Sequence, residues 1–583
     1  MTIREKISEL RNLMKDRNID TYVVTKFDPH QSEYSISYFS GVSFISGFTG
    51  SQGTFVITKT EAGLFTDGRY YIQATKELNG SGIVLLKEGQ PGTPTLAEYC
   101  ANNTAKGGTI AFDGRTISKK QAKDILEKAD NNNINLITDI DLLNDIWQDR
   151  PAIPNEPVFH HDIKYTGKTV SQKLEEVRTK MSIKNADAYI ISSLDDIAWL
   201  FNLRGSDVPY STIFFAYAII TPNEAILFTD KKDLNLDDGI TVKPYEDIYK
   251  YELTTNSNVM FCEARICMKL YERIKKHKCT ELEFDITTEL KAQKSDAEMK
   301  NIENAYIKDG VAVVKFIKWL KETVGTSTIT EYDVAQKILE FRRQQAEFLG
   351  ASFNTIAAYN GNGAMMHYRV DKDTAAEILP QGLLLVDSGG HYLDGTTDIT
   401  RTIVMGNASN DMKKHFTLTL KSVIALSVAK FLHGTTGVKL DTIARMPMWQ
   451  NNLDYKCGTG HGIGFCLNVH EGPHGIGFRG TNTVIEAGMM YSIEPGVYIE
   501  NEYGIRTENI AVCEKSVSND FGDFMCSRTI TFCPIDIEGI LTDLLTSEEK
   551  SWINSYHREV YEKLESYLTD EEKTFLKHET REI

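Results

Sequence analysis

The segment LLLVDSGGHYLDGTTDITRT, residues 383–402, decides the fold of the last third of this chain. An apolar run typical of a buried strand ends in Asp387, and a second strand, which contains Asp398, is expected to begin after the glycine turn at DGTT. A hairpin of that length places the two strand carboxylates side by side. Two adjacent aspartates in an apolar interior are very costly unless a cation neutralises them. The segment therefore predicts a β-hairpin that binds metal, with Asp394 as an ordinary turn residue.

Three more short motifs in the same third of the chain contain side chains that commonly bind metals. They are GTGHG with His461, SIEPG with Glu494 and RTEN with Glu508. Together with the two aspartates they make four carboxylates and one imidazole, which repel one another unless cations are present. An oxygen-rich set with a single nitrogen suits a pair of divalent ions such as Mn, Co or Zn. Two ions about 3.5–4 Å apart clamp the attacking water in aminopeptidases, so the set predicts a dinuclear peptidase.

Other residues near these motifs are candidates for supporting roles. Arg506 precedes Glu508 by two positions, hence shares its strand face, and we expect it to orient a ligand carboxylate. His470 is expected beside the site as a hydrogen-bond donor or acid/base. It opens HEGPH, residues 470–474, which fits the zincin pattern literally, but a glycine and a proline break the helix that zincins require. His367, in GNGAMMHY, is expected on a strand of its own, and both a structural and a catalytic role stay open.

The composition is that of an ordinary globular protein of several domains. Among its 583 residues 41% are hydrophobic and 25% are charged. The net charge of -17 and the lack of a basic block disfavour nucleic acid as a partner. No run of 18 apolar residues is present, so no membrane span is expected, and the first residues form a charged amphipathic helix pattern rather than a signal peptide. Nine cysteines without a CxxC pair predict reduced thiols in a cytoplasmic protein.

The first half of the chain contains an internal repeat. ELRNLMKDRNIDTYVV (residues 9–24) matches EVRTKMSIKNADAYII (residues 176–191), and EAGLFTDGRY (from 61) matches EAILFTDKKD (from 224) in the same order. Each copy has apolar residues at helical spacing followed by a β-branched run. The repeat predicts two tandem α/β domains of similar fold.

Two helices are predicted in the remaining part of the chain. The segment that begins near Ser295 has apolar positions at helical spacing and predicts one long helix that opens a third, α+β domain. Near the end, Thr546 and Glu549 have capping-box spacing, and an apolar face runs from Trp552 to Leu568. We expect this face to dock on the third domain, with subunit contact as the alternative.

The motifs together resemble a known family over essentially the full length. SFISGFTGSQGTFVIT, LFTDGRYYIQATKEL, DDIAWLFNLRGSD, DGTTDITRT, NVHEGPHGIGF, EAGMMYSIEPG and YGIRTEN are similar to cytosolic Xaa-Pro aminopeptidases (aminopeptidase P) of the pita-bread metallopeptidase family, in their three-domain eukaryotic form. The resemblance implies two creatinase-N-terminal-like α/β domains, at 1–155 and 156–295. It also implies a pita-bread catalytic domain at 296–583, with a C-terminal helical extension over about 538–583.

The resemblance also implies a role for each candidate metal ligand. Asp387 would bind one ion, Asp398 and Glu508 would bridge both, and His461 would bind the second. Glu494 would bind metal and relay protons. The ions would be two divalent cations, Mn²⁺ first, with Zn²⁺ or Co²⁺ as alternatives. The implied protein is a homodimer that uses a metal-bridging hydroxide to remove the first residue from peptides with proline second.

Four further residues enter through the resemblance. His367 and His470 would line the substrate site and stabilise the tetrahedral intermediate, and Arg69, in DGRYY, matches an arginine that reaches the substrate region. Cys457 departs from the family, which usually has HGTGHG where this chain has KCGTGHG. Because cysteine is a weak hydrogen-bond partner and is rarely charged at neutral pH, we expect lower activity or an altered pH dependence.

Three alternatives remain on the sequence alone. A prolidase-type dipeptidase would share the fold but has one N-terminal domain rather than two. Methionine aminopeptidase is disfavoured by the two extra domains. A non-catalytic pita-bread module that binds peptides would lose metal ligands, and all five are present here.

Overall fold

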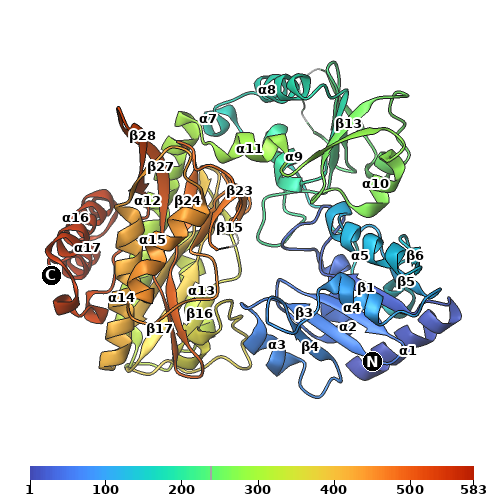
Figure 1. The fold of residues 1–583 in the computed structure, drawn as a ribbon. Coiled ribbons are helices and arrows are strands. Elements are labelled where there is room, and N and C mark those ends of the chain that lie inside the picture. Colours follow the sequence, from blue (N-terminus) through green and yellow to red (C-terminus); the bar gives the residue numbers. More distant parts are fainter. Residues whose placement is uncertain (235, 237–238, 479) are drawn as a thin grey trace. The chain divides into compact units, whose positions relative to one another are not determined.

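The computed structural model describes residues 1–234, 236, 239–478 and 480–583. These residues form two compact units, one of residues 1–162 and 168–287 and the other of residues 163–167 and 288–583 (Figure 1). The sequence-based limits at 155 and 295, which divide the chain into three domains, stay predictions.

Two six-stranded sheets in the first unit share one topology. Their strands are β1 (Thr21–Thr25), β2 (Thr54–Thr58), β3 (Ala62–Thr66), β4 (Val84–Lys87), β5 (Thr109–Phe112) and β6 (Asn135–Ile137), then β8 (Ala188–Ile191), β10 (Tyr217–Ile220), β11 (Ala225–Phe228), β12 (Ile240–Lys243), β13 (Asn258–Cys262) and β14 (Lys278–Leu282). The strand orders are β4-β3-β2-β1-β5-β6 and β12-β11-β10-β8-β13-β14. In both sheets the first strand is antiparallel to the second and parallel to the fifth. The predicted tandem pair of α/β domains is confirmed.

The repeated residues occupy matching places in the two halves. Helices α1 (Ile3–Asp16) and α8 (Val170–Ile183) each lead into the first strand of a sheet. Met14 and Met181 are both 2% exposed, and Tyr22 and Tyr189 are 1% and 0% exposed. The shared sequence pattern is therefore a pattern of core positions.

The second unit begins with the predicted long helix, α12 (Asp296–Thr323). Ser295 caps it with a capping box to Glu298, which satisfies free backbone N–H groups at the helix start. Its buried residues, which include Tyr306 and Phe316, pack in two clusters of apolar side chains of this unit. A second helix, α13 (Glu331–Arg343), packs beside it.

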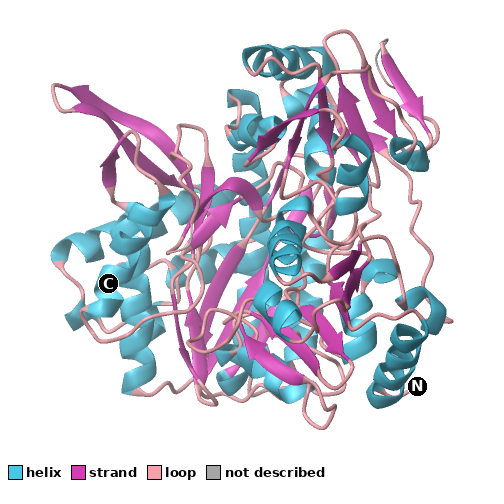
Figure 2. Cartoon of the chain, turned by 45° about the vertical axis from the view of Figure 1, so that its right-hand side comes forward, coloured by secondary structure: helices cyan, strands magenta, loops and turns pink. Residues whose placement is uncertain are grey.

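Two sheets and a bent ribbon carry the candidate site. The bounds are β16 (Ile356–Tyr359), β17 (Leu383–Ser388) and β20 (Ile399–Val404) for one sheet; β21 (Lys430–Leu432), β28 (Gly522–Thr529), β27 (Asn509–Asn519), β24 (Met490–Ile493), β22 (Gly460–Gly462) and β23 (Glu471–Ile476) for the other; and β25 (Gly496–Ile499) with β26 (Tyr503–Arg506) for the ribbon. Helices α14 (Asn410–Ser427) and α15 (Gly437–Trp449) pack against each other and against this second sheet (Figure 1). The β27–β28 hairpin extends beyond the sheet (Figure 2).

The C-terminal helix α16 (Ser547–Leu564) docks on the second unit as predicted. Thr546 and Glu549 form the capping box. Tyr556, Val560 and Leu564 are buried in the same cluster as Tyr306 of α12. Helix α17 (Asp570–Glu579) follows and also contacts α12. In the described part of the chain, no helix is both long and apolar enough for a membrane span.

Replacing Leu564 with alanine tests the docking of α16. The side chain is fully buried, so its loss leaves a cavity, and we expect the free energy of unfolding to fall by about 2–5 kcal/mol. Urea unfolding followed by circular dichroism measures the change. The exposed neighbour Glu562→Ala is the matched control and should stay within about 0.5 kcal/mol of the parent. Equal effects of the two substitutions would contradict the docking.

Candidate metal centre

The predicted hairpin around residues 383–402 is present and positions two aspartates. Strands β17 and β20 are antiparallel, and Asp387 lies opposite Thr400. Asp398 lies in a short break between β19 (Gly395–Thr396) and β20. Glycine is needed at the turn side of this hairpin, because a Cβ at Gly389 would lie 2.0 Å from the carbonyl oxygen of Thr397. The glycine-rich sequence therefore lets the two strands close up beside the carboxylates.

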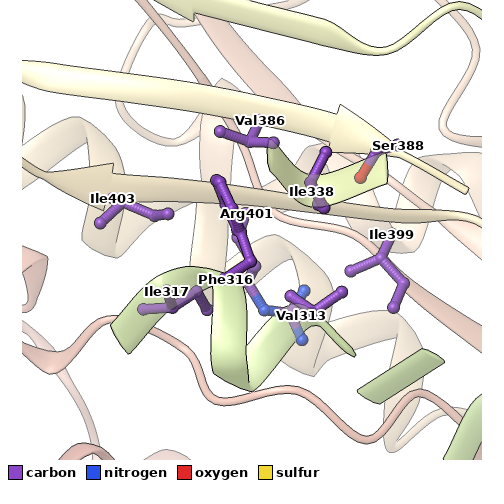
Figure 3. Close-up of a pocket in the computed structure, with 9 residues that line it drawn as sticks. All are labelled: Val313, Phe316, Ile317, Ile338, Val386, Ser388, Ile399, Arg401 and Ile403. Atoms are coloured by element: carbon purple, nitrogen blue, oxygen red, sulfur yellow. The ribbon is translucent and has the colours of Figure 1, made fainter. Parts of the chain in front are cut away.

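Strand alternation gives this hairpin two different faces. Asp387 and Thr400 share one face. The other face packs on α12 and α13 around an apolar void of about 10 Å³, enough for about one water molecule (Figure 3). The void is lined by Val313, Phe316, Ile317, Ile338, Val386, Ser388, Ile399, Arg401 and Ile403. This void is a small packing defect behind the site and is too small for a substrate.

Glu494 and Glu508 lie opposite each other where two strands bend out of the larger sheet. Glu494 falls between β24 and β25, and Glu508 between β26 and β27. Pairing of β24 with β27 and of β25 with β26 continues in one register on both sides of this bend. The register places the two glutamates face to face.

His461 brings a nitrogen to these carboxylates. Ligand atoms of Asp398, His461 and Glu508 all lie within 4.8 Å of one another. The Nε2 atom of His461 is 3.5 Å from Oδ2 of Asp398 and 3.4 Å from Oε1 of Glu494. A Cβ at Gly460 would lie 1.8 Å from the carbonyl oxygen of Ser492, so the glycine beside the histidine allows β22 to approach β24.

Two hydroxyl groups that sequence reasoning missed hold the ligands in place. Thr400 donates to Oε2 of Glu508 at 2.8 Å. Ser492 donates to Oε1 of Glu494 at 3.0 Å and accepts the backbone N–H of His461 at 3.0 Å. Each hydroxyl is two residues from a ligand position along the chain, so strand alternation was the available signal.

Arg506 is placed on the carboxylates, as its predicted orienting role requires. Its guanidinium contacts Oδ2 of Asp387 at 2.5 Å, donates to the hydroxyl of Tyr498 at 2.8 Å, and has Nε 4.0 Å from Oε2 of Glu494. Burial, which lowers the pKa of Arg506, is outweighed by these neighbours, so that pKa lies above its usual value. The guanidinium is therefore a fixed positive charge beside Asp387.

Arg401 ties the backbone at Glu508 to the C-terminal helix. Its guanidinium donates to the carbonyl oxygens of Glu508 and Cys533, the side-chain oxygen of Asn509 and the hydroxyl of Tyr556 on α16. No sequence pattern marked this residue, because its partners come from distant parts of the chain. Docking of α16 thus supports the ligand segment directly.

The electrostatics of the cluster fit a cation. Burial raises the pKa of Asp398 to about 6, and burial with neighbouring carboxylates raises the pKa of Glu508 well above its usual value. Despite burial, the carboxylates of Asp398 and Glu494 raise the pKa of His461 to about 9. Within the described residues, Oδ1 of Asp387 and Oε1 of Glu508 are buried without a hydrogen-bond partner. Buried carboxylate oxygens of this kind are ligands for hard or borderline divalent ions.

The histidines after His461 follow strand rather than helix geometry. The His470 ring lies 4.3 Å from that of His461, centroid to centroid, and nearly perpendicular to it. HEGPH enters strand β23, and His474 is buried with Nε2 bonded to the carbonyl oxygen of Met490. The rejection of a zincin helix is confirmed.

The remaining predicted site residues are His367 and Arg69. His367 lies half-buried in a turn after η3 (Asn360–Ala364), so its expected position on a strand is wrong; the glycines of this segment form a 3₁₀ turn instead. That turn packs on β17 and β26, the strands of Asp387 and Arg506. Arg69 belongs to the first unit, where Asp67 binds its guanidinium. Its reach to substrate and the catalytic role of His367 stay predictions.

The turn residue Asp394 lies outside the cluster. Its carboxylate is buried and accepts from Lys308 at 2.8 Å and from Asn304 at 2.6 Å, both on α12. Tyr306, two residues from each of them on α12, has its hydroxyl buried near Asp398. Nothing in the sequence marked Tyr306, because its proximity depends on how α12 packs.

Comparison with known proteins assigns the chain to a family. The model of metallopeptidase family M24 matches residues 300–515, and that of its C-terminal region matches 523–583. Models of the creatinase/prolidase N-terminal domain match 6–145 and 149–298. A probable Xaa-Pro aminopeptidase P from Talaromyces marneffei is 40% identical, covering 99% of this chain and 92% of the relative. The chain belongs to the Xaa-Pro aminopeptidase P family.

Other relatives agree with this membership. Aminopeptidase P2 of Arabidopsis thaliana is 38% identical over 97% of this chain and 87% of its own. The crystal structure of X-prolyl aminopeptidase from Caenorhabditis elegans covers 100% of both chains, with a TM-score of 0.96 and 32% identity. The predicted fold class is confirmed, with creatinase-type N-terminal domains and a pita-bread M24 domain.

Metal-free aminopeptidase should lose stability as pH rises. The pKa of Asp398 is raised from 3.8 to about 6, so its stabilising contribution is full below 3.8 and is lost as pH rises through about 6. The pKa of His461 is raised from 6.5 to about 9, so its contribution is full below 6.5 and is lost through about 9. The loss should be ~1–3 kcal/mol per group. Unfolding of chelator-treated protein across this pH window measures it.

The same experiment has two internal checks. Asp398→Asn should flatten the lower part of the profile, because no carboxyl group is left to ionise at that position. Added Mn²⁺ should restore stability at high pH, because ligands that bind only the folded state stabilise it. A metal-free profile that rises with pH would show that the cluster is not a set of buried, unneutralised charges.

Proposed function

We propose that this enzyme removes the N-terminal residue from peptides with proline at position 2, in a metal-dependent hydrolysis. The observation that carries the proposal is the group of Asp398, His461 and Glu508, whose ligand atoms all lie within 4.8 Å of one another. Glu494 contacts His461 of this group. Asp387 forms an ion pair with Arg506 beside it. All five positions have a residue of a type that commonly binds metal. A non-catalytic peptide-binding module would not need these residues.

Two divalent ions are proposed as the cofactor, with Mn²⁺ first and Zn²⁺ or Co²⁺ as alternatives. The C. elegans relative is described as having a di-nuclear active site. Here Asp387, Asp398, His461, Glu494 and Glu508 would hold the ions. Bound divalent ions lower the pKa of a coordinated water and polarise the scissile carbonyl.

The chain's own residues would handle the substrate and the proton. The nitrogen that leaves belongs to proline, so the peptide bond has no N–H and the amine must be protonated by the enzyme. Glu494 is suited to this because its side chain is 21% exposed, whereas that of Asp398 is 6% exposed. Ser492 orients Glu494, and His470, beside His461, would hydrogen-bond the developing oxyanion.

Two further assignments rest on relatives. A cytoplasmic location is proposed because the C. elegans enzyme is described as cytosolic. A homodimer is proposed by analogy with the family. Prolidase activity, the second candidate, would appear as cleavage of free Xaa-Pro dipeptides.

Cleavage of Arg-Pro-Pro, Arg-Ala-Ala and Arg-Pro by metal-free and Mn²⁺-loaded protein tests the assignment. We expect metal-dependent release of arginine from Arg-Pro-Pro alone. Asp398→Asn should lower kcat/KM by more than about 100-fold and reduce bound metal, because a ligand to the ions is lost. Asp394→Asn changes a buried carboxylate of the same hairpin outside the cluster and should keep metal and activity. Cleavage of Arg-Pro alone would move the assignment to prolidase.

Cys457→His tests the departure from the family. The thiol lies half-buried beside Tyr498, and burial, aided by the charge of Glu494, raises the pKa of Cys457 to about 11, so it is neutral. A histidine there offers a stronger, ionisable hydrogen-bond partner to the substrate. We expect kcat/KM for Arg-Pro-Pro to rise about 10-fold, and Cys457→Ala, which removes the thiol alone, to give no gain. An unchanged or lower value for the histidine variant would show that this position does not limit the enzyme.

A further inference from the structure

A buried ion triad lies directly behind the second histidine of the site. Glu471 is 4% exposed and follows His470 in the chain. Its two carboxylate oxygens contact different lysines, Oε1 that of Lys294 and Oε2 that of Lys291, the latter at 3.4 Å. Lys294 and Lys291 are 6% and 3% exposed. Three charged side chains are thus removed from solvent together.

Stability alone does not explain the burial of these three side chains, because the attraction within a buried ion pair barely offsets the desolvation of its charges. Glu471, although adjacent to the site in sequence, is fully engaged by the lysines and is not one of the cluster's ligand groups. Its carboxylate is therefore held by contacts within the protein.

The lysines come from the segment through which the chain enters the second unit. Lys291 lies in α11 (Ile286–Ala292) and Lys294 lies just before α12. Backbone contacts hold this segment to the start of β24, since the N–H of Lys294 donates to the carbonyl oxygen of Gly488 at 3.0 Å and Gln293 forms a bridge with Met489. The segment therefore supports both β23, which follows His470, and β24, which leads to Glu494.

A neutral histidine, His474, makes a second buried contact further along β23. Burial, with the charges of Lys294 and Lys291 contributing, lowers the pKa of His474 to about 4. Its Nε2–H then donates to the carbonyl oxygen of Met490, at 2.7 Å. Glu471 and His474 thus secure β23 at both ends of HEGPH.

We propose that Glu471 is a positioning residue, whose buried ion pairs with Lys291 and Lys294 fix the first residue of β23 and so hold the His470 imidazole beside His461. The catalytic consequence rests on the function proposed above, but the placement of the ring does not. A small displacement of a group that hydrogen-bonds the reacting carbonyl lowers turnover strongly while leaving distant contacts with the substrate intact.

Glu471→Gln tests this with a side chain of the same size and no charge. The matched control is Glu579→Gln. Glu579, on α17, is 5% exposed and pairs with Lys321 on α12, away from the metal centre. If Glu471→Gln does not fold, the paired variant Glu471→Gln with Lys294→Gln removes the opposite charges together, a change that ion-pair replacements tolerate better than loss of one partner.

The first readout is independent of activity. The imidazole signal of His470 in ¹³C-labelled protein is assigned by its loss in His470→Ala. With diamagnetic Zn²⁺ bound in place of Mn²⁺, we expect this signal to move in Glu471→Gln and to stay in Glu579→Gln, while both variants bind as much Zn²⁺ as the parent. An unmoved signal in Glu471→Gln overturns the proposal.

The second readout is kinetic and uses Arg-Pro-Pro. Glu471→Gln should lower kcat by about 10–100-fold with little change in KM, and Glu579→Gln should not. In a His470→Ala background, Glu471→Gln should cause no further loss; independent, multiplying losses would overturn the proposal. A moved His470 signal in a protein that cleaves none of the peptides would leave the positioning role standing and reject the proposed function.

Discussion

The structure of the second unit depends on the burial of like charges. Asp387, Asp398 and Glu508 are buried, and Glu494 and His461, whose side chains are each 21% exposed, lie beside them. Such a set is unfavourable until cations enter, and the raised pKa values of Asp398 and Glu508 record that cost. The fold has to hold these groups together against their repulsion, and the surrounding hydrogen bonds, ion pairs and helix docking serve that purpose.

Two kinds of contact hold these charged groups together. Strand register positions two pairs of carboxylates: Glu494 lies opposite Glu508 where the strands bend, and on the 383–402 hairpin Asp387 lies opposite Thr400, two residues after Asp398. Buried arginines then fix the pairs, Arg506 through Asp387 and Arg401 through the backbone of Glu508. Because Arg401 also binds Tyr556, the C-terminal helix is part of the scaffold of the site rather than an appendage.

The histidine side of the centre is built differently. His461 lies on a strand that approaches its neighbour only because Gly460 has no side chain. His470 is placed by the strand that follows it, and that strand is anchored by Glu471 and two buried lysines. Cys457, the departure from the family, is not one of the five candidate ligands, and its thiol is half-buried.

The sequence by itself determined the duplicated α/β halves, the hairpin, the long helix and the capped helix near the end of the chain, and it predicted the candidate ligand residues. These features follow from local periodicity, turn chemistry and the cost of unpaired buried carboxylates, all of which are properties of short segments. Only the tertiary structure showed that Thr400, Ser492 and Arg401 hold the ligands, that His367 lies in a turn, and that Glu471 is buried against lysines. Those contacts join residues far apart in the chain, and their energies depend on packing that no local pattern contains.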